Sequence, residues 1–236
     1  MKKHIPNTLT SLNLFSGSIA TVMAFQGEYT WVVVWVIIAA LFDFSDGLAA
    51  RLLKAYSPIG KELDSLADMV SFGLAPSIAA FRFLSDNTIR ISQNPIIVEY
   101  LPYIAFLLAI FSALRLAKFN VDERQSESFI GLNTPANAMF WVSFCYGLAY
   151  KVPMITPSLI YTFLVAIVVF SLLMVSEIPM FSLKIKNIKF KGNEYRYFLA
   201  AFIIVATITI GVLGIAAGIL LYITLSIFQQ TGILKK

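Results

Sequence analysis

Four aspartates are the residues of this sequence best suited to chemistry, because they form two closely spaced pairs within apolar sequence. Asp43 and Asp46 are three positions apart, and Asp64 and Asp68 are four positions apart. At either spacing the two side chains project from one face of a helix. Carboxylates gathered in this way repel one another unless a cation holds them, and hard divalent cations prefer such oxygen ligands. The pairs therefore predict a site for Mg²⁺ or Mn²⁺.

The residues that follow the first pair have the features of a phosphate-binding site. Gly47 and Ala50 share the helix face of the first aspartate pair and leave space in which a ligand could approach the backbone. Arg51 adds a planar fork of donors suited to phosphate oxygens. Gly47 and Ala50 alone would also fit close helix packing in a membrane. Beside four aspartates and an arginine, a phosphorylated ligand is the better interpretation.

Two other interpretations of the aspartates explain less of the pattern. The acids could be neutralised by Arg51, Lys54 and Lys61 at a helix end, but that leaves the doubled helical spacing unexplained. A cation transporter would also use carboxylates at membrane depth. It would need acids distributed along a path through several helices, whereas these occur on two adjacent segments.

The rest of the sequence is apolar enough to place these acids in an all-helical membrane protein. Hydrophobic residues make up 58% of the 236 residues and charged residues 13%, with a mean hydropathy of +0.80, whereas soluble domains contain about 45–50% and 25%. The aspartate pairs end the second apolar run and begin the third, so a hairpin around Pro58 would let both pairs face one cavity. Runs long enough to cross about 30 Å of hydrocarbon cover residues 9–25, 31–53, 65–84, 99–117, 135–151 and 155–175.

Composition also excludes other classes of site and partner. Cys145 is the only cysteine, so the sequence has neither a disulfide framework nor a cysteine metal site. The formal net charge of +5 is explained by basic residues beside the membrane and does not indicate a nucleic-acid partner.

The last apolar stretch, residues 197–228, predicts a C-terminal helical hairpin. It is too long for one ordinary span, and Gly211, Gly214 and Gly218 lie near its middle. Two spans in this stretch bring the total to about eight and return Lys235 and Lys236 to the side of the N-terminus.

The distribution of charge predicts how the chain lies in the membrane. With the N-terminus inside, only Arg82, Arg90 and Lys151 of the eighteen lysines and arginines lie outside. The other fifteen, including the cluster in residues 184–196, lie in the cytoplasm. This positive-inside bias predicts a multi-pass protein of the cytoplasmic (inner) membrane, with the acidic site facing the cytoplasm.

The aspartate region resembles the signature of the CDP-alcohol phosphatidyltransferase family, with every fixed position filled. The resemblance implies one membrane domain over residues 1–236, with a catalytic six-helix core in residues 1–180 and the hairpin as an addition. It also implies a homodimer, two bound metal ions and a CDP-alcohol donor. The matching pattern is Asp43-x2-Asp46-Gly47-x2-Ala50-Arg51-x8-Gly60-x3-Asp64-x3-Asp68.

Roles for individual residues follow from the same resemblance. It implies that all four aspartates are metal ligands and that Asp68 is also the general base. The residues implied to contact the nucleotide or its diphosphate are Gly47, Arg51 and Ser57 in the signature region, and Asn7 and Thr10 in the similar N-terminal segment Pro6-Asn7-Thr8-Leu9-Thr10.

Within the family, the sequence is similar to the membrane-embedded bacterial and archaeal phosphatidylserine synthases in residues 5–17, 71–76, 115–120 and 129–136. It departs from their usual Gly-Leu-Pro at Asn133, which puts the conformation of that loop in doubt. The similarity implies transfer of a phosphatidyl group from CDP-diacylglycerol to the hydroxyl of L-serine, giving phosphatidylserine and CMP. Glycerol 3-phosphate or inositol phosphate is the alternative acceptor, although a second phosphate would favour a larger basic pocket.

The predicted acceptor contacts lie near the cytoplasmic end of the fourth span. Arg115, Lys118 and Asn120 could bind the carboxylate of serine. Arg115 and Lys118 would also fit simple positive-inside anchoring, so the sequence leaves both interpretations open.

Overall fold

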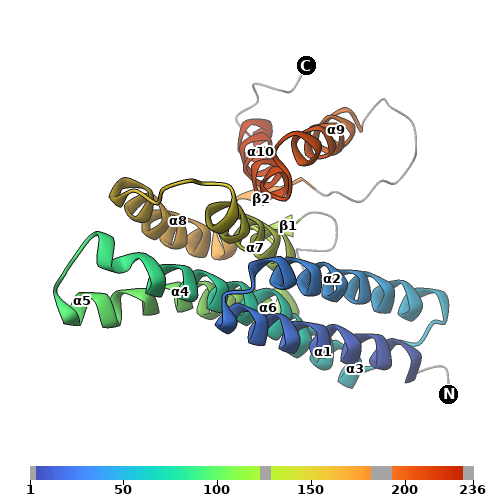
Figure 1. Ribbon diagram of the computed structural model, residues 1–236. Helices are drawn as coiled ribbons and strands as arrows, with labels where there is room; N and C mark the ends of the chain where they lie inside the picture. The colour runs from blue at the N-terminus through green and yellow to red at the C-terminus, as the bar shows by residue number, and fades with distance from the viewer. Residues whose placement is uncertain (1–3, 123–128, 182–192, 231–236) are drawn as a thin grey trace.

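The computed structural model describes residues 4–122, 129–181 and 193–230, and nearly all of these lie in helices (Figure 1). The described residues contain five helical segments that are long and apolar enough to cross a membrane: His4–Gln26, Tyr29–Leu52, Pro58–Arg90, Pro95–Val121 and Pro157–Val175. The expected all-helical membrane protein is therefore confirmed. Several basic residues used to orient the chain, among them Lys184, Lys235 and Lys236, lie outside the described residues.

The first two helices form a hairpin that carries half of the acidic signature. Helix α1 (His4–Gln26) ends before Gly27, whose positive φ of 76° turns the chain into α2 (Tyr29–Leu52). The buried face of α1 consists of small and polar residues, including Thr10, Asn13 and Gly17. Small side chains allow the neighbouring helices to approach closely.

The second half of the signature lies on a helix with a defined start and an irregular continuation. Ser57 is the N-cap of α3 (Pro58–Asp68), and its side chain accepts a hydrogen bond from the Gly60 amide at 3.1 Å. The chain continues through a π-helical segment, η1 (Met69–Leu74), into α4 (Ala75–Asn87) and a short 3₁₀ turn, η2 (Thr88–Arg90). The sequence did not predict the π-helix, and such segments often lie at functional sites.

The fourth predicted span is interrupted in a similar way. It consists of α5 (Pro95–Tyr100), the 3₁₀ segment η3 (Leu101–Ala105) and α6 (Phe106–Val121). Pro102 lies in η3, where a proline is compatible with a helix start. Helix α6 packs against η1 and α8, and Asn120 near its C-terminal end forms hydrogen bonds with Lys61 and Ser65 of α3.

The next two helices are joined at their ends by a short pair of strands. Strand β1 (Phe129–Ile130) precedes α7 (Thr134–Tyr150), and β2 (Pro179–Met180) follows α8 (Pro157–Val175); the strands pair antiparallel. Asn133, the departure from the family pattern, is the N-cap of α7, and its Oδ1 accepts from the Ala136 amide at 2.7 Å. The doubt about this loop is thus resolved, because asparagine is a favoured N-cap residue.

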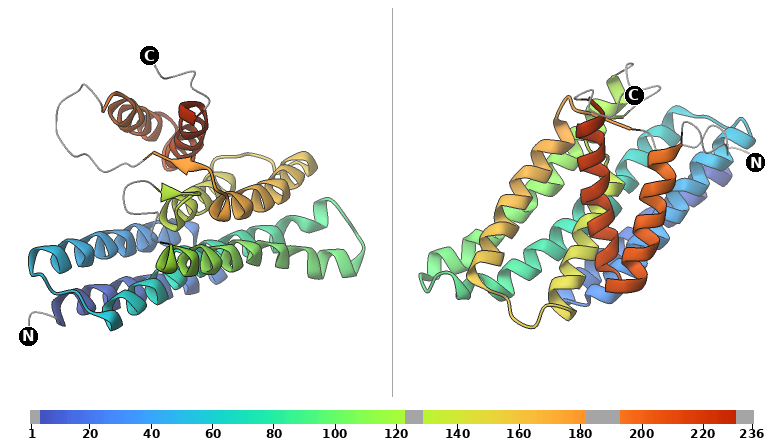
Figure 2. Two further views of the ribbon diagram at one scale, coloured as in Figure 1. Left: turned by 180° about the vertical axis from the view of Figure 1, so that it is seen from behind. Right: turned by 90° about the horizontal axis from the view of Figure 1, so that it is seen from above.

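The last two helices form a hairpin beside α7. Gly211, with φ of 70°, separates α9 (Glu194–Ile210) from α10 (Leu213–Gln230). A Cβ added at Gly214 would lie 2.4 Å from the backbone of Ala206, so only glycine permits this approach of the two helices. Figure 2 shows α10 between α7 and α9. The number of membrane crossings made by this hairpin stays a prediction.

Candidate active site

The structure brings three of the four aspartates together. Asp43 lies near the end of α2, and Asp64 and Asp68 lie on α3. One carboxylate oxygen from each of these three residues lies within 4.8 Å of the other two. The two helices thus face each other with three of the four acids in one place, which agrees with the helical spacing for these three. Asp46 lies outside this group, and its role as a metal ligand stays a prediction.

Helix α1 donates a hydrogen bond to one acid on each of the two acidic helices. The Thr10 hydroxyl donates to Oδ2 of Asp46 at 2.6 Å, and Nδ2 of Asn13 donates to Oδ1 of Asp68 at 3.1 Å. Thr10 and Asn13 are one helical turn apart and both are buried. The first helix therefore fixes the orientation of acids that come from two other helices.

Basic side chains do not neutralise these acids. Arg51 Nε donates to the Gly47 carbonyl at 3.0 Å, and Lys61 Nζ donates to the Asn120 carbonyl at 2.9 Å. In the described part of the chain, no ion pair involves any of the four aspartates. The geometry therefore does not favour the interpretation that Arg51, Lys54 and Lys61 neutralise the four aspartates.

The arrangement suits a hard cation. Oδ1 of Asp64 is buried and has no hydrogen-bond partner among the described residues. Buried carboxylate oxygens without donors are costly unless a cation compensates them. Asp43, Asp64 and Asp68 are therefore the residues that would hold a divalent metal ion, because carboxylate oxygens are the ligands such ions prefer.

A cavity of about 550 Å³ opens beside the three acids, and we call it the Arg115 cavity. Arg115 is only 6% exposed, and its Nε and Nη2 are buried without a hydrogen-bond partner among the described residues. A buried arginine whose donors have no protein partner among the described residues is suited to bind a planar anion such as a carboxylate. The polar residues lining the cavity are Asp43, Lys61, Asp64, Ser65, Asp68, Arg115, Asn120, Asn133 and Thr134.

The other two predicted acceptor contacts differ in position. Asn120 lines the Arg115 cavity, and its Nδ2 donates to the Ser65 hydroxyl at 2.9 Å. Lys118 is not among the lining residues and instead forms an ion pair with Glu177. Sequence reasoning could not foresee this pair, because Glu177 follows a different helix.

A second cavity of about 210 Å³, the Ser57 cavity, adjoins the first. Three of the predicted nucleotide contacts line it, namely Asn7, Thr10 and Ser57, together with Asp46. Asp64 and Lys61 line both cavities, so the two meet at the acids. Lys61 was not predicted as a site residue, although its position one residue after Gly60 in the signature was a signal.

Two predicted nucleotide contacts do not line either cavity. Arg51 is exposed at the end of α2. A Cβ added at Gly47 would meet no described atom within 4 Å, so the protein itself gives no packing reason for glycine there. Their roles toward a ligand stay predictions.

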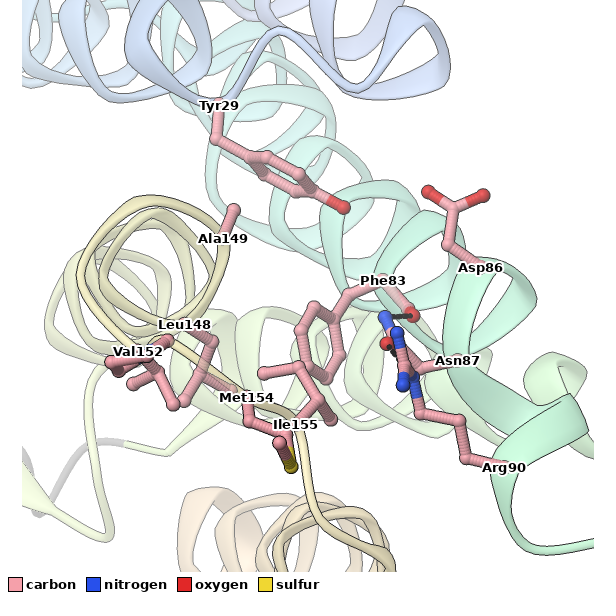
Figure 3. Close-up of a pocket in the computed structure, with 11 residues that line it drawn as sticks. Tyr29, Phe83, Asp86, Asn87, Arg90, Leu148, Ala149, Val152, Met154 and Ile155 are labelled. Atoms are coloured by element: carbon pink, nitrogen blue, oxygen red, sulfur yellow. Dashed lines mark hydrogen bonds between the residues drawn. The ribbon is translucent and has the colours of Figure 1, made fainter.

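A third cavity, of about 330 Å³ (Figure 3), is lined by Tyr29 at the start of α2, the opposite end of that helix from Asp43. Its lining also includes Asp86, Asn87 and Arg90 around the end of α4. Arg90 Nε donates to Oδ1 of Asn87 at 3.1 Å. Asp86 is the one acid lining this cavity, so it lacks the grouped carboxylates found beside Arg115.

The fold and site together define a helical membrane protein with a carboxylate cluster between its helices. A family model described as CDP-alcohol phosphatidyltransferase matches residues 3–213. The chain belongs to this family, and the resemblance carried by the aspartate signature is confirmed. The family is generally dependent on divalent metal ions, which agrees with the carboxylate cluster.

Curated relatives of the chain come from bacteria, archaea and yeast. A CDP-diacylglycerol–serine O-phosphatidyltransferase of Helicobacter pylori is 36% identical over 177 residues, covering 73% of this chain and 70% of the relative. The protein of the same name from Bacillus subtilis is 35% identical, covering 61% and 77%. An archaetidylserine synthase of Methanothermobacter thermautotrophicus is 32% identical, covering 59% and 57%.

Proposed function

We propose that the chain transfers the phosphatidyl group of CDP-diacylglycerol to the hydroxyl of L-serine, giving phosphatidylserine and CMP. The observation that carries this proposal is the position of the buried Arg115 guanidinium in the same cavity as Asp68 and its neighbouring acids. The same cavity thus offers a group that can bind a carboxylate and a group that can act as a base. The names of the relatives support the same reaction.

The acceptor end of the reaction uses the Arg115 cavity. Arg115 binds the serine carboxylate through donors that have no partner among the described residues. Serine is thereby held with its hydroxyl toward Asp68, which accepts the hydroxyl proton. Asn120 also lines this cavity, and we assign it to the acceptor site.

The bond changes occur where the two cavities meet. The serine oxygen forms a bond to the lipid-side phosphorus of CDP-diacylglycerol. The bond from that phosphorus to the bridging oxygen breaks, and CMP leaves with the oxygen and the electron pair. Lys61, which reaches both cavities, is placed to attract the diphosphate. Holding donor and acceptor in this alignment supplies much of the catalysis.

The nucleotide end uses the Ser57 cavity. Asn7, Thr10 and Ser57 supply hydrogen-bonding groups there, and we assign Gly47 and Arg51 to the donor as well, because Gly47 leaves open space at the end of α2. The donor's acyl chains remain in the surrounding lipid.

We further propose that Asp43, Asp46, Asp64 and Asp68 hold two Mg²⁺ or Mn²⁺ ions. When bound, these ions polarise the phosphoryl oxygens and stabilise charge on the leaving group. The protein side of the site is the set of carboxylates, which Thr10 and Asn13 keep in position.

We propose that the protein is a homodimer in the inner membrane. Each chain consists of a catalytic core in residues 1–180 and a hairpin in residues 197–228, and the acids face the cytoplasm. Cytoplasmic exposure follows from the positive-inside bias and gives the site access to serine and nucleotide. Native mass spectrometry of the protein in detergent tests the oligomeric state. A homodimer should have twice the chain mass of 26.2 kDa.

An acceptor panel tests the reaction. Purified protein is incubated with CDP-diacylglycerol, Mg²⁺ or Mn²⁺, and labelled serine, glycerol 3-phosphate or inositol phosphate. The expected result is a labelled lipid with serine only, formed together with an equal amount of CMP. A labelled lipid formed from another acceptor but not from serine would refute serine as the substrate and leave the family chemistry in place.

A further inference from the structure

In the described structure, the side chain of Asn13 forms a single hydrogen bond, and its partner is Asp68, the proposed base. Asn13 is 0% exposed, and its Nδ2 donates to Oδ1 of Asp68 at 3.1 Å. Its own Oδ1 is buried and has no partner among the described residues. Burying an amide with an unpaired oxygen is unfavourable. The contact with Asp68 is therefore the interaction that accounts for an asparagine at this position.

The backbone at Asn13 also contacts the neighbouring segment η1. The Ser71 hydroxyl, in the π-helical segment η1, donates to the Asn13 carbonyl at 3.0 Å. One turn further along α1, Gly17 lies against Ser71 so closely that an added Cβ would be 2.6 Å from the Ser71 Cα. These contacts fix α1 against the segment that directly follows Asp68, so the amide of Asn13 cannot easily move away.

The direction of the hydrogen bond determines what it does for Asp68. An ionised carboxylate only accepts hydrogen bonds, so the amide end of Asn13 must face it. Donation to Oδ1 takes one of the acceptor positions of that oxygen and fixes the plane of the carboxylate. The remaining acceptor positions of Asp68 are then left for the metal ion and for the acceptor hydroxyl in the Arg115 cavity, which Asp68 lines.

We propose that Asn13 is a positioning residue for the transfer reaction, which orients the Asp68 carboxylate toward the acceptor hydroxyl. This inference rests on the proposed function of Asp68. It assigns to α1 a part in the chemical step that is separate from nucleotide binding, because Asn13 does not line the Ser57 cavity.

The test compares Asn13→Leu, Asn13→Asp and Ser16→Ala in the purified full chain. Leucine keeps the volume but removes the donor, and aspartate keeps size and polarity but can only accept when ionised. Ser16 is a matched control on the same helix, because it is 1% exposed and, among the described residues, its hydroxyl bonds only to the Leu12 carbonyl. Rates are expressed per molecule of protein that binds CDP-diacylglycerol, so a loss of folded protein does not count as a loss of turnover.

We expect Asn13→Leu to lower kcat about 10- to 100-fold, the scale of a misplaced catalytic group, with KM for CDP-diacylglycerol and for serine changed less than about threefold. Asn13→Asp should be at least as impaired, and Ser16→Ala should keep kcat within about twofold. A normal kcat in Asn13→Leu, or higher activity in Asn13→Asp than in Asn13→Leu, would overturn the positioning role. If the wild-type chain makes no product from serine, the proposed function fails instead.

Discussion

The Thr10 hydroxyl lies 2.6 Å from Oδ2 of Asp46 and connects the first helix to the acidic end of the second. Both residues are buried, and both line the Ser57 cavity. A helix that carries no acid of its own is thus part of the site.

Thr10→Val should weaken donor binding, because valine keeps the shape of threonine but leaves Asp46 without its donor. We expect KM for CDP-diacylglycerol to rise about 10- to 100-fold, the scale of one lost hydrogen bond to a charged group. Thr10→Ser should retain most of the affinity. Thr8→Val is the control, because within the described part of the chain the Thr8 hydroxyl bonds only to the His4 carbonyl of its own helix. Equal KM values for Thr10→Val and Thr8→Val would contradict the role.

Asp64→Asn should raise the Mg²⁺ or Mn²⁺ concentration that gives half-maximal activity by about tenfold or more, since a ligand charge is lost. Asp64 is the acid that lines both cavities. Glu62→Gln is the control, because Glu62 is an exposed acid on the same helix. Titration of activity with each metal measures the effect. A metal dependence of Asp64→Asn that matches Glu62→Gln would refute the assignment.

Arg115→Gln should raise KM for serine about 10- to 100-fold and change KM for CDP-diacylglycerol little, because it removes a charge-assisted pair with the carboxylate. Lys118→Gln should change KM for serine less than about twofold, since Lys118 pairs with Glu177 outside the cavity. Steady-state kinetics with each substrate varied in turn separates the two. A larger rise in KM for serine in Lys118→Gln than in Arg115→Gln would show that Lys118, and not Arg115, contacts the acceptor.

Gly17→Ala and Gly47→Ala should behave differently. The added methyl group at residue 17 would lie 2.1 Å from the Ser71 hydroxyl, whereas at residue 47 it would meet no described atom within 4 Å. We expect Gly17→Ala to lose about 1–3 kcal/mol of stability through overpacking. Gly47→Ala should keep the stability of the wild type and bind CDP-diacylglycerol less tightly. Thermal unfolding in detergent and a donor-binding assay distinguish the two variants.

Cysteine labelling tests the orientation in the membrane. The native Cys145 is buried, so introduced cysteines can be followed. Val212, at the turn of the α9–α10 hairpin, should lie on the same side as Lys151, because a Cβ at the neighbouring Gly211 would be 3.9 Å from Lys151 Cε. A membrane-impermeant maleimide applied to intact cells should label Lys151→Cys and Val212→Cys but not Lys54→Cys. Labelling of Lys54→Cys alone would reverse the proposed topology.

The sequence predicted the parts of the site that depend on local spacing. The aspartate pairs could be placed on facing helices because three- and four-residue separations define a helix face. Asn13 was missed because a polar residue in an apolar helix has many possible partners, although its three-residue separation from Thr10 was a usable signal. The π-helix after Asp68 was missed because its shifted backbone hydrogen bonding has no sequence pattern of its own. The Lys118–Glu177 pair depends on how α6 and α8 pack, and a local sequence pattern does not predict this packing.

The most direct test of the account measures transfer and donor binding in the same samples of wild-type protein and Asp68→Asn. Wild-type protein with CDP-diacylglycerol, serine and Mg²⁺ or Mn²⁺ should form phosphatidylserine and CMP in equal amounts. Asp68→Asn should lose about 100-fold or more of this rate, because the amide cannot accept the serine proton, while it still binds CDP-diacylglycerol. Near-normal turnover by Asp68→Asn would contradict the proposed base, and wild-type protein that forms no phosphatidylserine would contradict the proposed function.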